Sequence, residues 1–396
     1  MFSKGKKILV FIFVICYVNA IPCIGKDPSN RSRLRFWTVG NIDGVNKRFG
    51  THFYQTLAEL QKNKTEFDCF LLALAEQPLA ERDIMEKCNL PTTRIYQFIT
   101  TLKSLNLIRK SEKEGWTTTV PVITDKQMER VKEGMIPLAQ RVVQYLKNEV
   151  PKIKIVYEKE KSVSDPAWEK VAHLIIDKLI VDATFHRAIG ILEREKGFKQ
   201  YYSQDQKHIP AFFLELGPNY STFGVNWYRF EQDNQKREVY ILHGALFKRF
   251  VIRFNQYRDD QNFSHMLHRI TPDGHLKALT TQEKKVFKEL DWIEKDRLLV
   301  PILKAKNIKI ILPDLEKIGR NAAVVVFQNY SIILNSFNNS PYAKFMDASG
   351  DYIQVCYHVL FSEIIEQLII AGVLPPIPES VPEYLGVFIT IGSVFE

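Results

Sequence analysis

Three small groups of residues in the C-terminal half carry side chains that could do chemistry. His265 and His268 are three residues apart, so a helix would present both imidazoles on one face, where they could bind a metal ion. No third ligand has a suggestive spacing. We therefore expect both histidines to be solvated surface residues and expect no metal site.

The second and third groups lie near the end of the chain. Cys356 and His358 are two residues apart, which on a strand places them on one face. There they could form a thiolate–imidazole pair for nucleophilic catalysis. We expect the alternative, in which these two side chains pack where a strand meets a helix. Asp347 and Asp351 flank Ala-Ser-Gly in MDASGDY, a composition typical of a turn rather than of an acid/base pair.

The sequence contains none of the common catalytic or nucleotide-binding motifs. The phosphate loop GxxxxGKS/T, the dinucleotide fingerprint GxGxxG, the metalloprotease motif HExxH and the nucleophile elbow GxSxG are all missing. The sequence therefore predicts a protein that is not an enzyme and needs no cofactor.

The elements that could position a binding surface are clearest in the N-terminal third. Apolar spacing and helix breakers predict three helices and a β-hairpin: residues 67–76, residues 79–88, a helix that begins after the turn at 89–91, and the strands 109–112 and 116–122. Pro91 suits the first turn of the third helix, where its missing N–H costs nothing. On that helix Ile95, Phe98, Ile99, Leu102 and Leu105 form the expected buried stripe.

This order of elements resembles a known family. The segment FDCFLLALAEQPLAERDIMEKCNLPTTRIYQFITTLKSLNLIRKSEKEGWTTT is similar to the winged helix-turn-helix domains of MarR- and ArsR-type transcription regulators, over residues 53–125. The resemblance implies a winged-helix fold and, as in that family, binding of duplex DNA. The same fold also serves as a protein-interaction module, so the alternative partner is a protein.

If the module binds DNA, its third helix would enter the major groove and its wing would contact phosphate or the minor groove. The outward side chains of these elements are the expected DNA-binding residues: Thr92, Thr93, Arg94, Tyr96, Gln97, Lys103, Lys110 and Lys113. Arg94 and Gln97 could make bidentate base contacts. The alternative is a solvated polar face, which any surface helix needs.

Charge gives DNA binding little support. The whole chain has a formal net charge of +9, which favours an anionic partner. Residues 51–125, however, contain nine Lys and Arg against ten Asp and Glu. That balance is not the basic footprint of a strong DNA binder.

The first twenty residues are typical of a signal peptide. Lys4, Lys6 and Lys7 precede the apolar run 8–18, and Val18-Asn19-Ala20 offers a cleavage site. The run is too short for a membrane-spanning helix of about 20 residues, so no membrane span is expected after cleavage. The sequence therefore predicts an exported, periplasmic or secreted protein, and a cytoplasmic one if the segment is not cleaved.

Cysteine usage leaves the compartment open. None of the five cysteines form a CxxC motif. Cys69 and Cys88 lie on neighbouring predicted helices, where we expect them to act as small core residues. In an exported protein they could also form a disulfide.

A helix predicted over residues 125–150 connects the two halves of the chain. Its apolar stripe consists of Val131, Met135, Leu138, Val142, Val143 and Leu146, with a bend expected at Pro137. In winged-helix regulators a helix at this place often builds a homodimer interface, here through residues 126–150. The alternative is packing between the two halves of one chain.

The remainder reads as a mixture of helices and strands. Helices are expected over residues 166–196, 280–292 (with Thr281 as a possible cap) and 357–371, and strands over 211–216, 222–230, 238–242, 250–254, 308–312, 322–327 and 331–334. The expected fold class is mixed α+β, with an N-terminal winged helix-turn-helix domain followed by a larger α+β domain. The expected divisions are 1–20 signal peptide, 21–52 linker or arm, 53–125 winged helix, 126–160 connecting helix and linker, and 161–396 α+β domain.

Three functions are compatible with these features. The first is a non-catalytic, exported binding or regulatory module with a MarR/ArsR-like fold. The second is a DNA-binding transcription regulator whose C-terminal half senses a ligand or dimerises. The third, an enzyme of unrecognised type, requires a cluster of groups with perturbed pKa values in a C-terminal cleft.

Overall fold

The structure is a computed structural model and belongs to the mixed α+β class, as the sequence predicts. It describes residues 34–38, 42–111, 115–161, 165–182, 211–217, 223–244, 254, 257, 260–271, 273–276, 278–294, 297–344, 349–376 and 386–394. The predicted signal segment 1–20 lies outside these residues, as do Lys113 and Asp347.

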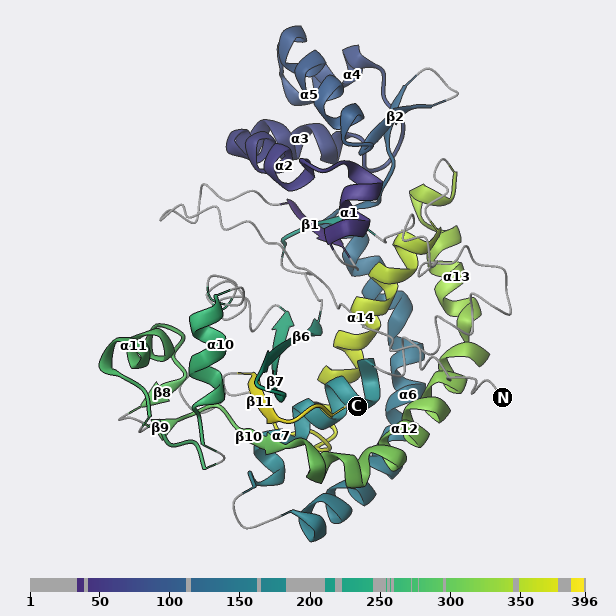
Figure 1. The fold of residues 1–396 in the computed structure, drawn as a ribbon. Helices are drawn as coiled ribbons and strands as arrows, with labels where there is room; N and C mark the ends of the chain where they lie inside the picture. Colours follow the sequence, from purple (N-terminus) through teal and green to yellow (C-terminus); the bar gives the residue numbers. More distant parts are fainter. Residues whose placement is uncertain are drawn as a thin grey trace, which may run out of the picture.

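The N-terminal unit (residues 34–123) contains the expected helices and hairpin. Its helical elements are α1 (Ile42–Phe49), α2 (Phe53–Leu60), η2 (Gln61–Asn63, a 3-10 helix), α3 (Lys64–Ala73), α4 (Glu81–Cys88) and α5 (Thr92–Ser104), and its hairpin pairs β2 (Ile108–Lys110) with β3 (Trp116–Thr118) (Figure 1). Asn89 ends α4 in the left-handed conformation, with φ of 50°, and Pro91 is the N-cap of α5. The predicted stripe on α5 is buried, from Ile95 to Leu105.

The region expected to be a linker, residues 21–52, is partly structured, and this prediction was wrong for residues 34–38 and 42–49. Strand β1 (Leu34–Thr38) pairs antiparallel with β5 (Ala211–Glu215), and β5 pairs parallel with β4 (Val122–Ile123). The Gly- and Asn-rich composition hid α1, because packing of Val45 and Phe49 into the core stabilises a helix of weak intrinsic propensity. Strand β5 comes from the region assigned to the C-terminal domain, yet its Ala211 and Phe213 belong to the core of the N-terminal unit.

The connecting helix is longer than predicted. Helix α6 runs from Asp125 to Glu160, through both Pro137 and Pro151, so the linker expected after residue 150 is helical. Its apolar stripe continues with the buried Ile153 and Tyr157, and this packing outweighs the cost of a proline inside a helix. A capping box of Thr124 and Gln127 begins the helix.

The stripe offered above for a homodimer is buried within the chain. Val131, Met135, Leu138, Val142, Val143 and Leu146 are all at most 6% exposed. They lie in the larger hydrophobic core, where α6 packs against α12 (Ala305–Gln328) and α14 (Ser349–Ile370). Packing within one chain is therefore the alternative that the structure adopts for these residues.

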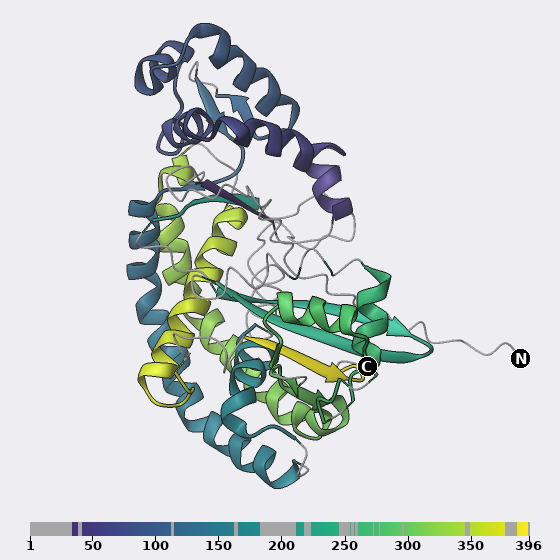
Figure 2. The same cartoon turned by 90° about the vertical axis from the view of Figure 1, so that its left-hand side faces the viewer.

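The C-terminal body comprises α6 and the elements that follow it, apart from β5. The long helices α6, α12 and α14 lie beside a four-stranded sheet (Figures 1 and 2). The sheet has the order β10 (Ile302–Lys304), β11 (Val387–Ile391), β7 (Gln235–Gly244), β6 (Phe223–Gln232), and only the β10–β11 pair is parallel. The remaining elements are α7 (Trp168–His173), η3 (Leu174–Asp182, a π-helix), α10 (Gln261–His268), α11 (Thr281–Glu289), β8 (Ile293–Glu294), β9 (Arg297–Leu298), α13 (Tyr330–Asn338) and η4 (Pro341–Lys344).

Several local predictions for this body are confirmed. Strands over 211–216, 222–230 and 238–242 correspond to β5, β6 and β7, and the helix over 357–371 is the later part of α14. Helix α11 is present, but its N-cap is Thr280 rather than Thr281. The helical run from 166 is described as far as Asp182, and the strand over 250–254 lies almost entirely outside the described residues.

Three predicted strands are helical. Residues 308–312 and 322–327 belong to α12, and residues 331–334 belong to α13. Short apolar runs do not distinguish a buried strand from a buried helix. The buried positions of α12 include Ile308, Ile311, Leu315, Ile318 and Ala322, and this spacing of three and four residues is helical.

One segment in the described part of the chain is long and apolar enough to cross a membrane. It is Asp351–Ile370 in α14, and 78% of its apolar window is buried inside the protein. A core helix has this composition as well.

Candidate functional site

The candidate binding face is the outer side of α5 with the neighbouring hairpin. Of the eight residues predicted to bind DNA, six are exposed, namely Thr92, Thr93, Tyr96, Gln97, Lys103 and Lys110. Tyr96 is the most prominent apolar group, at 53% exposure. The remaining two are Arg94, which is largely buried, and Lys113, which lies outside the described residues.

Arg94 is held against the protein. Its Nε donates to Glu66 Oε2 on α3 at 2.6 Å, and its guanidinium lies over the Phe98 ring, 4.5 Å from the centroid. A further hydrogen bond joins Nη1 of Arg94 to Oε1 of Gln97. The two residues best suited to bidentate base contacts therefore bind each other and an acid, and the side chain of Arg94 is only 17% exposed.

Tyr96 has an acidic neighbour as well. A hydrogen bond to Glu81 and the charge of that carboxylate raise the pKa of the Tyr96 hydroxyl. Glu81 also accepts a hydrogen bond of 3.1 Å from Nε1 of Trp116 on the hairpin. Glu81 thus connects α4, α5 and β3, and it places a negative charge on the candidate binding face.

On the hairpin, Lys110 Nζ lies 5.8 Å from the centroid of the Trp116 ring. This cation–π contact holds the lysine along the hairpin, although the residue is exposed. Thr92, at the other end of the face, donates weakly to Met85 Sδ at 3.7 Å.

A disulfide joins Cys69 of α3 to Cys88 of α4, with the two Cα atoms 5.7 Å apart. The sequence left open whether Cys69 and Cys88 are separate core residues or a disulfide, and the structure has the disulfide.

Cys356 is a free, buried thiol, and burial raises its pKa to about 12. A thiol with such a pKa is unreactive at neutral pH.

The histidine and cysteine groups of the C-terminal half do not assemble a reactive site. His268 places Nδ1 against the Ser264 carbonyl at 2.8 Å and Nε2 against the Gln235 carbonyl at 3.1 Å, whereas His265 is exposed. Within the described residues, no group of three or more His, Cys, Asp or Glu could hold a metal ion.

Cys356 and His358 lie on α14, so the strand considered for them was wrong. Helical residues two positions apart point to nearly opposite sides, and each of these two makes its own contact. Cys356 Sγ lies 3.9 Å from Ser336 Oγ, and His358 Nδ1 lies 2.7 Å from the Gln354 carbonyl.

Asp351 also lies on α14, where a turn was predicted. It accepts two hydrogen bonds from Arg48 of α1, at 2.9 and 2.8 Å, and one from the backbone N–H of Ala211 at 3.0 Å. The carboxylate is 7% exposed. Asp351 therefore connects two parts of the fold, whereas Asp347, considered with it as an acid/base pair, lies outside the described residues.

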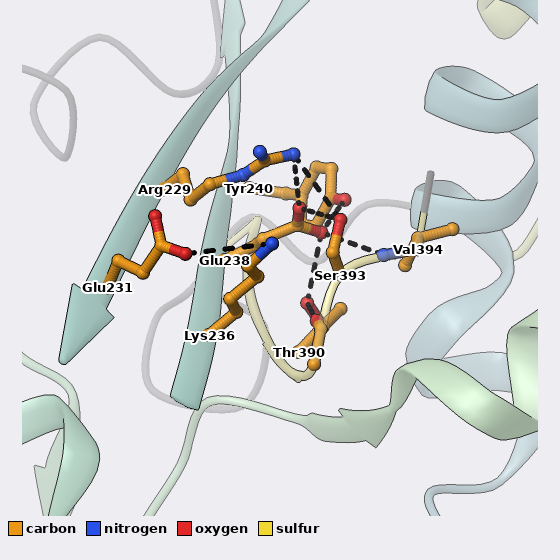
Figure 3. A network of polar contacts seen from close by, with 9 residues as sticks. Arg229, Glu231, Lys236, Glu238, Tyr240, Thr390, Ser393 and Val394 are labelled. Carbon is orange, nitrogen blue, oxygen red and sulfur yellow. Dashed lines mark hydrogen bonds and ion pairs between the residues drawn. The ribbon is translucent and has the colours of Figure 1, made fainter. Parts of the chain in front are cut away.

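Sequence reasoning missed a buried carboxylate in the sheet, Glu238 on β7 (Figure 3). The side chain is 0% exposed. Oε1 accepts from Ser393 at 2.8 Å and from Arg229 at 3.3 Å. Oε2 accepts from Tyr240 at 2.7 Å, from the Val394 N–H at 3.2 Å and from Thr390 at 3.4 Å.

The sequence signal for this network is the dipeptide Asp233-Asn234 between β6 and β7. Both residues have positive φ, of 48° and 59°, as a two-residue type I′ turn requires. That turn pairs Gln232 with Gln235 and so sets Arg229 opposite Glu238. A buried carboxylate with this many donors ties the last residues of the chain to the sheet, which is a structural role.

A second missed group lies on α7 and η3. His173 Nδ1 lies 3.0 Å from Asp177 Oδ2, and its Nε2 lies 2.9 Å from the Pro375 carbonyl. Lys178 donates to Asp182, which also accepts a 2.7 Å hydrogen bond from Tyr357.

The pKa values of this group are shifted by burial and charge. Burial opposes protonation of His173, but the Asp177 carboxylate and the carbonyl of Pro375 outweigh it and raise the pKa. Burial raises the pKa of Asp177 against the effect of His173. Both side chains are at most 1% exposed, so a substrate in solution does not reach this pair.

Comparison of the chain with known protein families, with curated proteins and with solved structures gives no match.

Proposed function

We propose that this is a non-catalytic, exported binding protein in which residues 53–125 form a winged helix-turn-helix module. The proposed partner is a protein that binds the outer face of α5. The observation that carries the proposal is the internal pairing of Arg94 with Glu66 and Gln97. A DNA-reading helix needs these donors free for base edges.

The electrostatics of the face support a protein partner over duplex DNA. Glu66 and Glu81 lie beside Arg94 and Tyr96, and DNA phosphates would repel both carboxylates. An exposed tyrosine beside an arginine that is held in place suits a protein interface, where these two residue types commonly provide much of the binding energy.

The disulfide and the N-terminal sequence together support export. Disulfides persist in oxidising compartments and are rare where glutathione keeps thiols reduced. The Cys69–Cys88 bond is therefore consistent with the basic and apolar segment 1–20 acting as a signal peptide.

The alternative is a transcription regulator. The order of three helices and a hairpin favours it, as do the exposed Lys103 and Lys110. In that case Glu66 would restrain Arg94 until DNA displaces it. The substitution Glu66→Gln would then release the arginine and strengthen binding to DNA.

Photo-crosslinking in the native host tests the proposal. A photoreactive phenylalanine analogue replaces Tyr96, and in a control variant it replaces Lys62, which is exposed on η2. We expect a protease-sensitive adduct from position 96 and none from position 62. A nuclease-sensitive adduct from position 96, or salt-dependent DNA affinity that Glu66→Gln increases, would overturn the proposed protein partner.

The proposed export has its own test. The mature N-terminus is expected near Ile21, and thiol labelling of the unreduced protein should leave Cys69 and Cys88 unmodified. An intact Met1 together with labelled cysteines would place the protein in a reducing compartment and favour the regulator.

A further inference from the structure

A cavity of about 400 Å³ lies where the first turns of α6 meet α13, η4 and α14. Its size falls in the range of small-molecule sites, and it is far larger than the roughly 30 Å³ that one water occupies. The α6 side of the cavity carries Gln127, Arg130 and Gly134. The opposite walls include Ile332 of α13, Pro341 of η4 and Tyr352 of α14.

Gln127 provides the cavity with a buried donor that has no partner in the described part of the chain. Its Oε1 accepts from the Thr124 N–H at 2.9 Å and lies 3.1 Å from the Tyr342 hydroxyl. A backbone N–H can only donate, so the amide oxygen must face Thr124 and the amide nitrogen must point the other way. Among the described residues that nitrogen has no hydrogen-bond partner, although the residue is only 7% exposed. A buried donor without an acceptor is uncommon in native proteins, and an acceptor group bound in the cavity would satisfy it.

Arg130 provides one positive charge beside this donor. It lies three residues after Gln127, so the two side chains project from the same face of α6. Arg130 is exposed, and among the described residues no salt bridge joins it to a carboxylate. An anionic group between the two residues could accept from both.

Gly134 provides the space. An added Cβ at this position would lie 3.8 Å from Ser336 Oγ, an ordinary contact, whereas a longer side chain would extend into the cavity. Glycine inside a helix costs about 1 kcal/mol relative to alanine. The open space at this turn is therefore maintained against helix propensity.

We propose that this cavity binds a small organic monocarboxylate. The carboxylate accepts hydrogen bonds from Gln127 Nε2 and Arg130, and its apolar body packs against Ile332, Pro341 and Tyr352. A single guanidinium balances one negative charge, which favours a carboxylate over a phosphate dianion. This inference is independent of the partner proposed for α5.

Calorimetric titration of the full-length protein tests the site with hexanoate and its uncharged counterpart hexanamide. We expect hexanoate to bind at least tenfold more tightly than hexanamide. Arg130→Gln should remove this preference. Lys126→Gln is the matched control, because it removes the same charge from the same end of α6 at a position that does not line the cavity, and it should retain the preference.

Substitutions at Gly134 locate the ligand. Gly134→Leu should abolish hexanoate binding because it fills the cavity, and Gly134→Ala should retain binding and confirm that the helix tolerates a Cβ. Equal affinity for hexanoate and hexanamide, hexanoate binding that survives Gly134→Leu, tighter binding of inorganic phosphate, or no binding of hexanoate would each overturn the proposal.

Discussion

Glu238 provides the sharpest test of how the C-terminal body is held together. The substitution Glu238→Gln preserves the shape of the side chain and removes its charge. The new amide must keep its oxygen toward the Val394 N–H, because that backbone donor cannot rotate away. Its NH₂ group then faces Arg229 and Ser393 in place of Oε1.

The expected loss of stability in Glu238→Gln depends on which donors lose their hydrogen bond to the carboxylate. The Ser393 hydroxyl can reverse and accept from the new amide, so its hydrogen bond survives. Arg229 cannot reverse, and it loses a charge-assisted hydrogen bond of a kind that contributes about 1.5–3 kcal/mol. The Arg229 side chain is 26% exposed, so water compensates in part. We expect Glu238→Gln to lower the free energy of unfolding by about 2 kcal/mol.

Urea unfolding followed by tryptophan fluorescence measures this change. The matched control is Glu231→Gln on β6 (Figure 3), where the carboxylate is 57% exposed and lies 3.6 Å from Lys236 Nζ. An exposed pair of this kind contributes at most about 1 kcal/mol. If the two variants lose the same stability, Glu238 does not hold the sheet to the C-terminal residues, and the reasoning is refuted.

A double-mutant cycle locates the effect. Arg229→Gln combined with Glu238→Gln removes both charges, so the double variant should lose less than the sum of the single losses. Additive losses would show that Arg229 and Glu238 do not interact in solution.

Three further predictions concern other contacts. Cys69→Ser opens a disulfide between residues separated by 19 positions and should lower the free energy of unfolding by about 3 kcal/mol. If the reduced and the oxidised wild-type protein are equally stable, this prediction is contradicted. Arg48→Met leaves the buried carboxylate of Asp351 without its cation and should cost roughly 3 kcal/mol in thermal or urea unfolding, whereas a loss under about 1 kcal/mol would show that the pair is dispensable. The raised pKa values of His173 and Asp177 mean that the folded chain binds protons more tightly than the unfolded chain. The urea midpoint should therefore fall as pH rises above the ordinary histidine value of 6.5, and His173→Gln should weaken this dependence; a wild-type midpoint that rises with pH would contradict the assignment.

The predicted binding residues show how far local patterns reach. Alternation of apolar and polar residues at helical spacing placed Tyr96 and Gln97 on the outer side of α5, and both are exposed. The same pattern placed Arg94 there. Its side chain instead folds back to Glu66, which is 28 residues away and belongs to another helix. Helical spacing determines the direction of a side chain but not its partner.

The ligand cavity and the buried polar groups were beyond sequence reasoning. Gln127 was identifiable in principle as the third residue of a capping box, but the cavity that it lines also includes Tyr342, 215 residues away. Asp351 resembled a turn residue because its neighbours are small and polar, and its contact with Arg48 spans 303 residues. Such pairs arise only when the chain is folded.

The sequence by itself determined the mixed α+β class, the three helices and hairpin of the N-terminal unit, and the strands β5, β6 and β7. These depend on periodicity, caps and turn residues, which act over a few neighbouring positions. Only the tertiary structure decided that α6 continues through Pro151, that residues 308–327 form a helix, and that β1 pairs with β5. In each case burial against distant parts of the chain contributes more free energy than local propensity, and a local pattern does not contain that contribution.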